Sequence, residues 1–230
     1  MKNHNKFLNR RYLARYHPSA FLLAAQLISL LLYILLEGYP GGRTLLGAFG
    51  LLVLALVVWV ISRSSKFRWA IWLLAAVAFV LSLLTALFET PSLVLWSSLL
   101  EAVLYFYAAG GLILYMMGDY RVTVDELFAA GATFTLLAWG FAYLYQVNQA
   151  WFPGSILGGA DPAGQKTFLE LLSLSFTNLS ATGLGDIMPA NSLGRVLVML
   201  EQFTGIAYVA TVVSRLIGMT IAGRKNKGNA

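Results

Sequence analysis

The sequence contains no cysteine, which excludes disulfide bonds, thiolate metal sites and cysteine nucleophiles. Charged side chains are scarce too: they account for 11% of the 230 residues, whereas a soluble domain carries about 25%. Only two histidines are present, His4 and His17, and both precede the first long apolar segment. A serine protease of the membrane needs a histidine within its spans, and a metalloprotease needs an HExxH motif, so the sequence disfavours both.

Apolar residues are abundant, at 59% of the chain, and the mean hydropathy is +0.73. Six apolar stretches are each long enough to cross a hydrocarbon core about 30 Å thick, because a helix rises about 1.5 Å per residue. In lipid the backbone polar groups must be satisfied internally, so we predict an all-α membrane protein with six transmembrane helices. The stretches lie at about 19–36, 44–62, 69–88, 93–117, 124–147 and 193–221.

A different kind of segment separates the fifth stretch from the sixth. Residues 148–166 are polar and glycine-rich, and residues 167–179 predict a helix too short to cross a membrane. A stretch punctuated by glycines follows, and Pro189 precedes the last apolar stretch. Non-helical backbone at membrane depth is tolerated only where protein buries it or where it lines water. We therefore predict a re-entrant pore helix at 167–179 and a filter at 180–186.

Lysine and arginine residues are distributed asymmetrically along the chain. Most lie before the first stretch, in the connectors after the second and fourth stretches, and in the tail at 222–230. These regions share one side of the membrane if six helices alternate, and basic residues favour the cytoplasmic side. We predict a multi-pass protein of the plasma membrane or a bacterial inner membrane, embedded in lipid, with both termini cytoplasmic. The net charge of +6 is then explained without a nucleic-acid partner.

The stretch from Ser175 to about Met219 resembles the pore of potassium channels, with a pore helix, a filter and an inner helix. The filter of that family reads TVGYG, and this chain reads ATGLG followed by Asp186 and Pro189. Gly194-Arg195 follows the filter at the family's spacing, and Gly205 lies where the family's inner helix often has a hinge glycine. The matching filter residues are Ala181, Thr182, Gly183, Leu184 and Gly185.

This resemblance implies that carbonyl oxygens of the filter replace the hydration shell of the permeant ion. The ion would be K⁺, bound by the backbone carbonyls of Ala181, Thr182, Gly183 and Leu184, with no other cofactor. Since the pore loop occurs once per chain, we predict a homotetramer. Three residues depart from the family pattern: Ala181 stands for threonine, Thr182 for valine and Leu184 for tyrosine. A weakly selective Na⁺/K⁺ channel is therefore the alternative prediction.

Several further positions keep two interpretations open. Asp186 forms either an acidic ring at the outer mouth or a hydrogen bond behind the filter. Glu101, Glu201 and Arg215 lie within predicted spans, where ionisable residues are either functional or paired between helices. A helical stripe on the last stretch is either a candidate inner gate or a packing face; its residues are Ile206, Val209, Val213 and Ile217.

The predicted helices group into a peripheral domain and a pore domain. The stretch 93–117 contains no lysine or arginine, so we expect no classical voltage gating. We also expect no small-molecule-binding domain in the short tail. The regions are a basic cytoplasmic N-terminus at 1–18, a four-helix peripheral domain at 19–117, a pore domain at 118–221 and a cytoplasmic tail at 222–230. The pore domain contains an outer helix, the pore helix, the filter and an inner helix at 193–221.

Other function classes are weaker. Residues 183–186 read GLGD, which matches the GxGD motif of intramembrane aspartyl proteases, but such an enzyme needs a second aspartate within a neighbouring span. The remaining aspartates, Asp119, Asp125 and Asp161, lie outside the predicted spans or at their ends. A transporter usually shows an inverted repeat, and none is evident. We expect a channel and no enzyme, with a non-conducting channel homologue as a further alternative.

Overall fold

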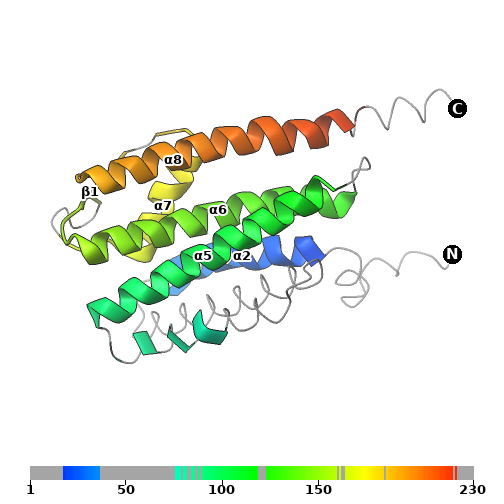
Figure 1. Ribbon diagram of the computed structural model, residues 1–230. Helices are drawn as coiled ribbons and strands as arrows, with labels where there is room; N and C mark the ends of the chain where they lie inside the picture. Colours follow the sequence, from blue (N-terminus) through cyan, green and yellow to red (C-terminus); the bar gives the residue numbers. More distant parts are fainter. Residues whose placement is uncertain are drawn as a thin grey trace, which may run out of the picture.

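The chain is almost wholly helical in the parts that the structure, a computed structural model, describes (Figure 1). The described residues are 18–36, 76–78, 80–81, 84–85, 88, 90–118, 123–159, 161, 164–183, 185–219 and 221. The helices are α2 (Pro18–Leu36), α5 (Pro91–Met116), α6 (Val124–Trp151), α7 (Phe168–Leu179) and α8 (Ser192–Tyr208), which continues into a π-helical turn at Val209–Val213. The predicted span at 44–62 and most of that at 69–88 lie outside these residues.

Local sequence signals explain where the longer helices begin. The Thr123 side chain accepts a hydrogen bond from the backbone N–H of Glu126, and the Glu126 carboxylate accepts one from the N–H of Thr123. This reciprocal pair satisfies two N–H groups that would otherwise be unpaired at the start of α6. Helix α5 begins at Pro91, which suits a first turn because proline has no N–H to leave unpaired.

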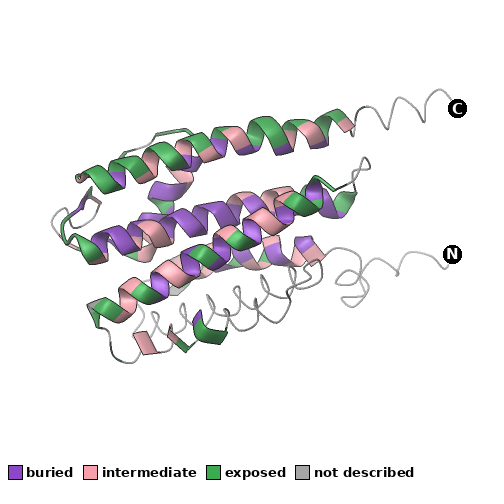
Figure 2. Cartoon of the chain, viewed as in Figure 1, coloured by how far each residue is buried: buried purple, intermediate pink, exposed green. Residues whose placement is uncertain are grey.

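Helix α6 forms the centre of the described bundle. It lies against α5, α2, α7 and α8, and Figure 2 shows it as the most continuously buried helix. Small residues such as Ala132, Ala138 and Ala142 are fully buried, so neighbouring backbones approach closely. By length and composition, three helices among the described residues could cross a membrane: Ser92–Met116, Val124–Trp151 and Ser192–Met219. Six spans remain a prediction.

Hydrogen bonds fix which helix ends lie together. Asp125, in the first turn of α6, accepts hydrogen bonds from the backbone N–H of Ser19 at 3.1 Å and from the Tyr115 hydroxyl at 3.3 Å. The start of α2, the end of α5 and the start of α6 therefore meet at one end. At the opposite end, Asn148 near the end of α6 pairs with Asn191, the N-cap of α8.

A two-stranded antiparallel sheet lies at this second end. Strand β1 (Ile156–Gly158) follows α6, and strand β2 (Ile187–Pro189) precedes α8. Gly158 has φ +93°, and a Cβ there would overlap the carbonyl oxygen of Asp186. The close approach therefore requires glycine. The sheet ties the segment after α6 to the residues that follow the predicted filter.

Candidate functional site

The short helix α7 is built as a buried insertion between α6 and α8. It has 12 residues, so it is about 18 Å long and cannot span a bilayer. Thr167 and Glu170 form a capping box at its start, as at the start of α6. Its apolar face is fully buried, and the Phe176 ring contacts Trp139 of α6 with the ring centroids 6.3 Å apart. Helix α7 falls within the predicted 167–179 segment.

The residues after α7 fold back on its last turn. The backbone N–H groups of Thr182 and Gly183 both donate to the carbonyl oxygen of Thr177, at 3.0 Å and 3.2 Å. The N–H of Ala181 donates to the carbonyl oxygen of Asn178 at 3.0 Å. The first half of the predicted filter is thus hydrogen-bonded to the helix that precedes it, and a displacement of that helix end would displace the filter backbone.

Two alternate residues of this segment are left-handed: Ala181 has φ 58° and Gly183 has φ 65°. Among the described residues, Ala181 is the only non-glycine residue with positive φ. For an alanine this conformation costs roughly 1–2 kcal/mol, and strained residues of this kind cluster at functional sites. Conformations that alternate in this way are those a chain needs to turn successive carbonyl groups towards one axis.

The other predicted filter residues lie at the surface of the chain. Thr182, Gly183, Gly185 and Asp186 are exposed, whereas Leu184 lies outside the described residues. The Thr182 hydroxyl donates to the carbonyl oxygen of Thr177 at 3.1 Å and lies 3.0 Å from the Ser180 hydroxyl. The structure therefore brings the segment to one exposed edge of the molecule. The ion-binding role of these residues stays a prediction.

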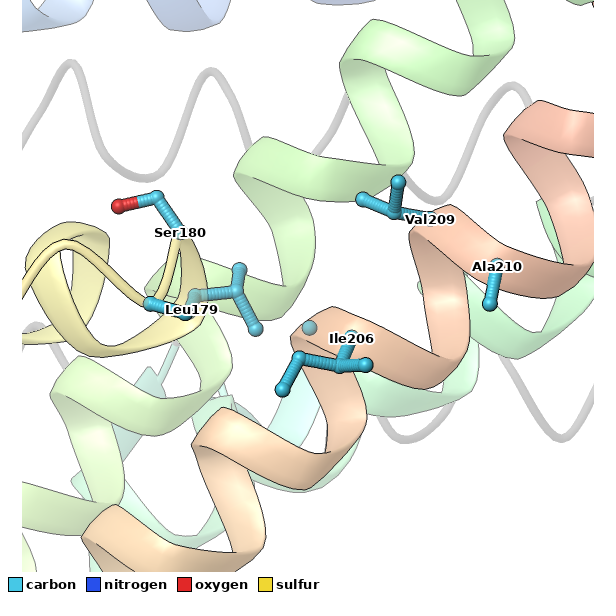
Figure 3. A pocket seen from close by; sticks show the side chains of 7 residues that line it. Leu179, Ser180, Ile206, Val209 and Ala210 are labelled. Atoms are coloured by element: carbon cyan, nitrogen blue, oxygen red, sulfur yellow. The ribbon is translucent and has the colours of Figure 1, made fainter.

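A pocket of about 290 Å³ lies beside the start of this segment. Leu179 and Ser180 border it from the end of α7, and Ile206, Val209 and Ala210 border it from α8 and the π-helical turn (Figure 3). Ala181 and Gly205 complete its lining. Within the predicted gate stripe, Ile206, Val209 and Ile217 are exposed, and Val213 is partly buried.

Gly205 lies where α8 crosses the end of α7. It is buried, and a Cβ at this position would overlap the backbone carbonyl of Leu179. The helix is regular at Gly205 and departs from α-helical geometry at Val209–Val213, one turn later. This contact explains the glycine without a hinge. A hinge at Gly205 remains a prediction.

Comparison with known proteins assigns a class to this arrangement. A family model described as "Ion channel" matches residues 72–222. The chain belongs to this ion channel family. The match covers α5 to α8 and supports a potassium-channel-like pore. Searches of curated proteins and of solved structures found no match. The family and the apolar helices mark the chain as a membrane protein of ion transport and point away from an enzyme.

Sequence reasoning singled out Glu201 of this ion channel but missed its partners. Glu201 is fully buried on α8 and accepts a 2.6 Å hydrogen bond from the Tyr145 hydroxyl of α6. The Ser175 hydroxyl of α7 also contacts its carboxylate. The partners lie 56 and 26 residues away in sequence. The signal in the sequence was that Tyr145 and Ser175 are polar residues within apolar helices.

Two other ionisable residues of the channel are paired between helices. Glu101 of α5 is buried, and the Tyr143 hydroxyl of α6 forms a hydrogen bond with it. Arg215, beyond the π-helical turn, donates a 2.7 Å hydrogen bond to the carbonyl oxygen of Met116 at the end of α5. Pairing between helices was one of the two interpretations that the sequence left open, and the structure shows it for both residues.

Asp125 and Asp186 lie too far apart to form the aspartate pair that the protease alternative needs. Asp125 lies in the first turn of α6, whereas the backbone of Asp186 pairs with Gly159, beyond the other end of α6. Helix α6 has 28 residues, so about 40 Å separates its ends. Two carboxylates at that distance cannot share a proton across one substrate. Asp119 lies outside the described residues.

Proposed function

We propose that this protein is a homotetrameric cation channel that conducts K⁺ through backbone carbonyls of Ala181, Thr182, Gly183 and Leu184. The observation that carries the proposal is the pair of left-handed residues, Ala181 and Gly183, directly after a short buried helix in a chain of an ion channel family. Carbonyl rings of this kind replace the hydration shell of the ion and let ions pass by mutual displacement.

The exposed face of α8 suits contacts with other copies of the chain. In the most apolar part of the helical segment Ser192–Met219, 22% of residues are buried, against 61% for α6. Figure 2 shows α8 as largely exposed. Large apolar side chains on this face include Met199, Leu200 and Phe203. Their exposure suits contacts with neighbouring copies and with lipid. Four copies would place four filters around one axis, with Asp186 at the outer mouth.

The dipole of the short helix α7 favours a cation beside the predicted filter. The C-terminal end of α7 borders the pocket beside Ala181, and the partial negative charge of a helix C-terminus favours a cation there.

Helix α5 contains no lysine or arginine, so we propose a channel that is not classically voltage-gated. In the membrane, the end where α6 begins would face the cytoplasm.

Weak selectivity between Na⁺ and K⁺ is the second candidate. Ala181 lines the pocket at the innermost filter position, and its methyl group offers no side-chain oxygen to an ion. The first carbonyl ring would then lack the extra ligands that the potassium channel family usually has at this position. This candidate keeps the same fold and the same conduction path.

Purified protein in planar bilayers tests both candidates. Under a K⁺/Na⁺ gradient, a reversal potential close to the K⁺ equilibrium potential supports a K⁺ channel, and an intermediate value supports weak selectivity. Gly183→Ala is the matched variant: nothing lies within 4 Å of the added methyl, yet φ at this position is +65°. We expect this variant to fold and its current to fall, because alanine at this φ carries a strain of roughly 1–2 kcal/mol that a change of the filter backbone would relieve. Wild-type protein with no cation current under any condition would contradict the proposal.

A further inference from the structure

The inner helix α8 meets the pore helix α7 at three successive levels. Glu201 contacts the Ser175 hydroxyl, and one residue later the Gln202 amide donates to the Asn178 side-chain oxygen at 3.4 Å. One turn further along α8, Gly205 lies against the Leu179 carbonyl. The contacts advance together along both helices. The second half of α7 is therefore registered against α8.

Glu201 is the most deeply buried part of this contact. Its side chain is 0% exposed, and each carboxylate oxygen has a hydroxyl partner: Oε2 accepts from Tyr145 at 2.6 Å, and Oε1 faces Ser175. The Ser175 oxygen also lies 2.8 Å from the carbonyl oxygen of Ala138 in α6. One carboxylate thus joins α6, α7 and α8. Buried groups of this kind need their partners, because an unpaired polar atom is costly.

The residues next to Ser175 hold the filter backbone. The carbonyl oxygen of Thr177 accepts from Thr182 and Gly183, and that of Asn178 accepts from Ala181. A shift of the last two turns of α7 would therefore move the carbonyl acceptors that hold the N–H groups of the filter. Glu201 is therefore connected to the filter backbone through Ser175 and the last turn of α7.

We propose that Glu201 is a positioning residue of the filter: it fastens the pore helix to the inner helix and so makes filter geometry depend on where the inner helix lies. The inference rests on the proposed conduction through residues 181–185. The contacts that carry the inference are those of the Glu201 carboxylate with Tyr145 and Ser175, because they join the inner helix to α6 and to the pore helix.

Glu201→Gln tests this role in the full-length channel in bilayers. Glutamine keeps the size of the side chain but has one acceptor oxygen, so residue 201 can accept from Tyr145 or from Ser175 but not from both. We expect the K⁺/Na⁺ permeability ratio to fall about fivefold, the effect of one lost hydrogen bond on the balance between an ordered and a loosened filter. Mean open times should shorten as well.

Glu126→Gln is the matched control, because Glu126 is a buried carboxylate in the capping box at the far end of α6. Its permeability ratio should equal that of the wild type. Both readouts are measured per open channel, so a loss of folded protein does not alter them. An unchanged ratio in Glu201→Gln would overturn the inference, whereas the absence of wild-type current would contradict the proposed function itself.

Ser175→Ala and Tyr145→Phe keep the inference testable if Glu201→Gln does not assemble. Each removes one hydroxyl and leaves the carboxylate in place. Ser175→Ala should lower the permeability ratio, because it cuts the connection to the pore helix. Tyr145→Phe should have the smaller effect on the ratio, because Tyr145 lies on α6. The opposite order, or no effect of Ser175→Ala, would overturn the inference.

Discussion

The Arg215 guanidinium of the inner helix donates a 2.7 Å hydrogen bond to the carbonyl oxygen of Met116 at the end of α5. Carbonyl groups in the last turn of a helix have no partner within the helix, and a cation there also suits the helix dipole. Arg215 lies beyond the π-helical turn at Val209–Val213. The part of the inner helix that follows this turn is therefore attached to α5, outside the predicted pore domain.

The part of the inner helix before the turn is attached elsewhere. The Tyr208 hydroxyl donates to the carbonyl oxygen of Ala130 in α6 at 2.7 Å. The π-helical turn thus lies between an attachment to α6 and an attachment to α5. Turns of this kind often occur at functional sites and at bends of long helices. A movement of α5 would be transmitted to the inner helix below the turn.

Arg215→Ala should destabilise the protein by about 1 kcal/mol, since it removes one hydrogen bond to a partly buried carbonyl. In a chain of this size that loss corresponds to a fall of about 2–4 °C in Tm. Thermal unfolding in detergent measures the change. Arg195→Ala is the control, because Arg195 is an exposed arginine on the same helix. Equal melting temperatures for the two variants would contradict the role given to Arg215.

Gly205→Ala should be strongly destabilising, because the added methyl would overlap the Leu179 carbonyl. Forcing one extra carbon into a tight contact costs about 1–3 kcal/mol. Gly218→Ala is the matched control: it lies on the same helical segment, and nothing lies within 4 Å of its added methyl. That variant should gain about 0.5–1 kcal/mol, since alanine favours a helix over glycine. Opposite signs in the two unfolding measurements are the expected outcome.

A Gly205→Ala protein as stable as the wild type would show that α8 and α7 can separate at this point. Gly205 would then be free to act as the predicted hinge. A large loss of stability would instead assign the glycine to close packing. The bend of the inner helix would then belong to the π-helical turn at Val209–Val213.

The features that local sequence determines were predictable. The short helix after the polar segment, its capping box at Thr167 and Glu170, and the apolar span of the inner helix all follow from residue order and spacing. Gly183 also indicated an unusual backbone conformation. These features depend on neighbours a few residues apart, where hydrogen-bonding rules and periodicity apply directly.

Contacts between distant helices were not predictable in the same way. The sequence marked Glu201 and Arg215 as unusual but could not name Tyr145, Ser175 or the Met116 carbonyl as partners, because helix rotation and register decide them. The left-handed Ala181 was also hidden, since alanine gives no signal for positive φ. The π-helical turn lies in an ordinary apolar run, so composition alone does not locate it.

Asp186→Asn should lower the single-channel K⁺ current at low salt. Four exposed carboxylates at the outer mouth would concentrate cations there. We expect a fall of about twofold at roughly 0.01 M salt, where the Debye length is about 30 Å, and almost none at about 1 M, where it is about 3 Å. Glu126→Gln is the control, because Glu126 lies in the first turn of α6, at the opposite end of the molecule from Asp186. A current loss that does not depend on salt would contradict an electrostatic role for Asp186.

Ala181→Gly and Ala181→Val should separate backbone strain from side-chain effects in the filter. Glycine relieves a cost of roughly 1–2 kcal/mol at φ 58°, but its extra freedom in the unfolded chain offsets about 0.5–1 kcal/mol of that gain. Stability should therefore change little, and conduction should persist. Valine should lower both Tm and current, because a β-branched residue is a genuine outlier at positive φ.

Ala190→Val is the control for that pair, because Ala190 is exposed, lies just after β2 and has no positive φ. Its Tm and single-channel current should match those of the wild type. If Ala181→Val behaved like Ala190→Val in both measurements, residue 181 would tolerate a branched side chain. The left-handed conformation at the innermost filter position would then not be required for conduction. The alternation of Ala181 with Gly183 would then no longer support the proposed function.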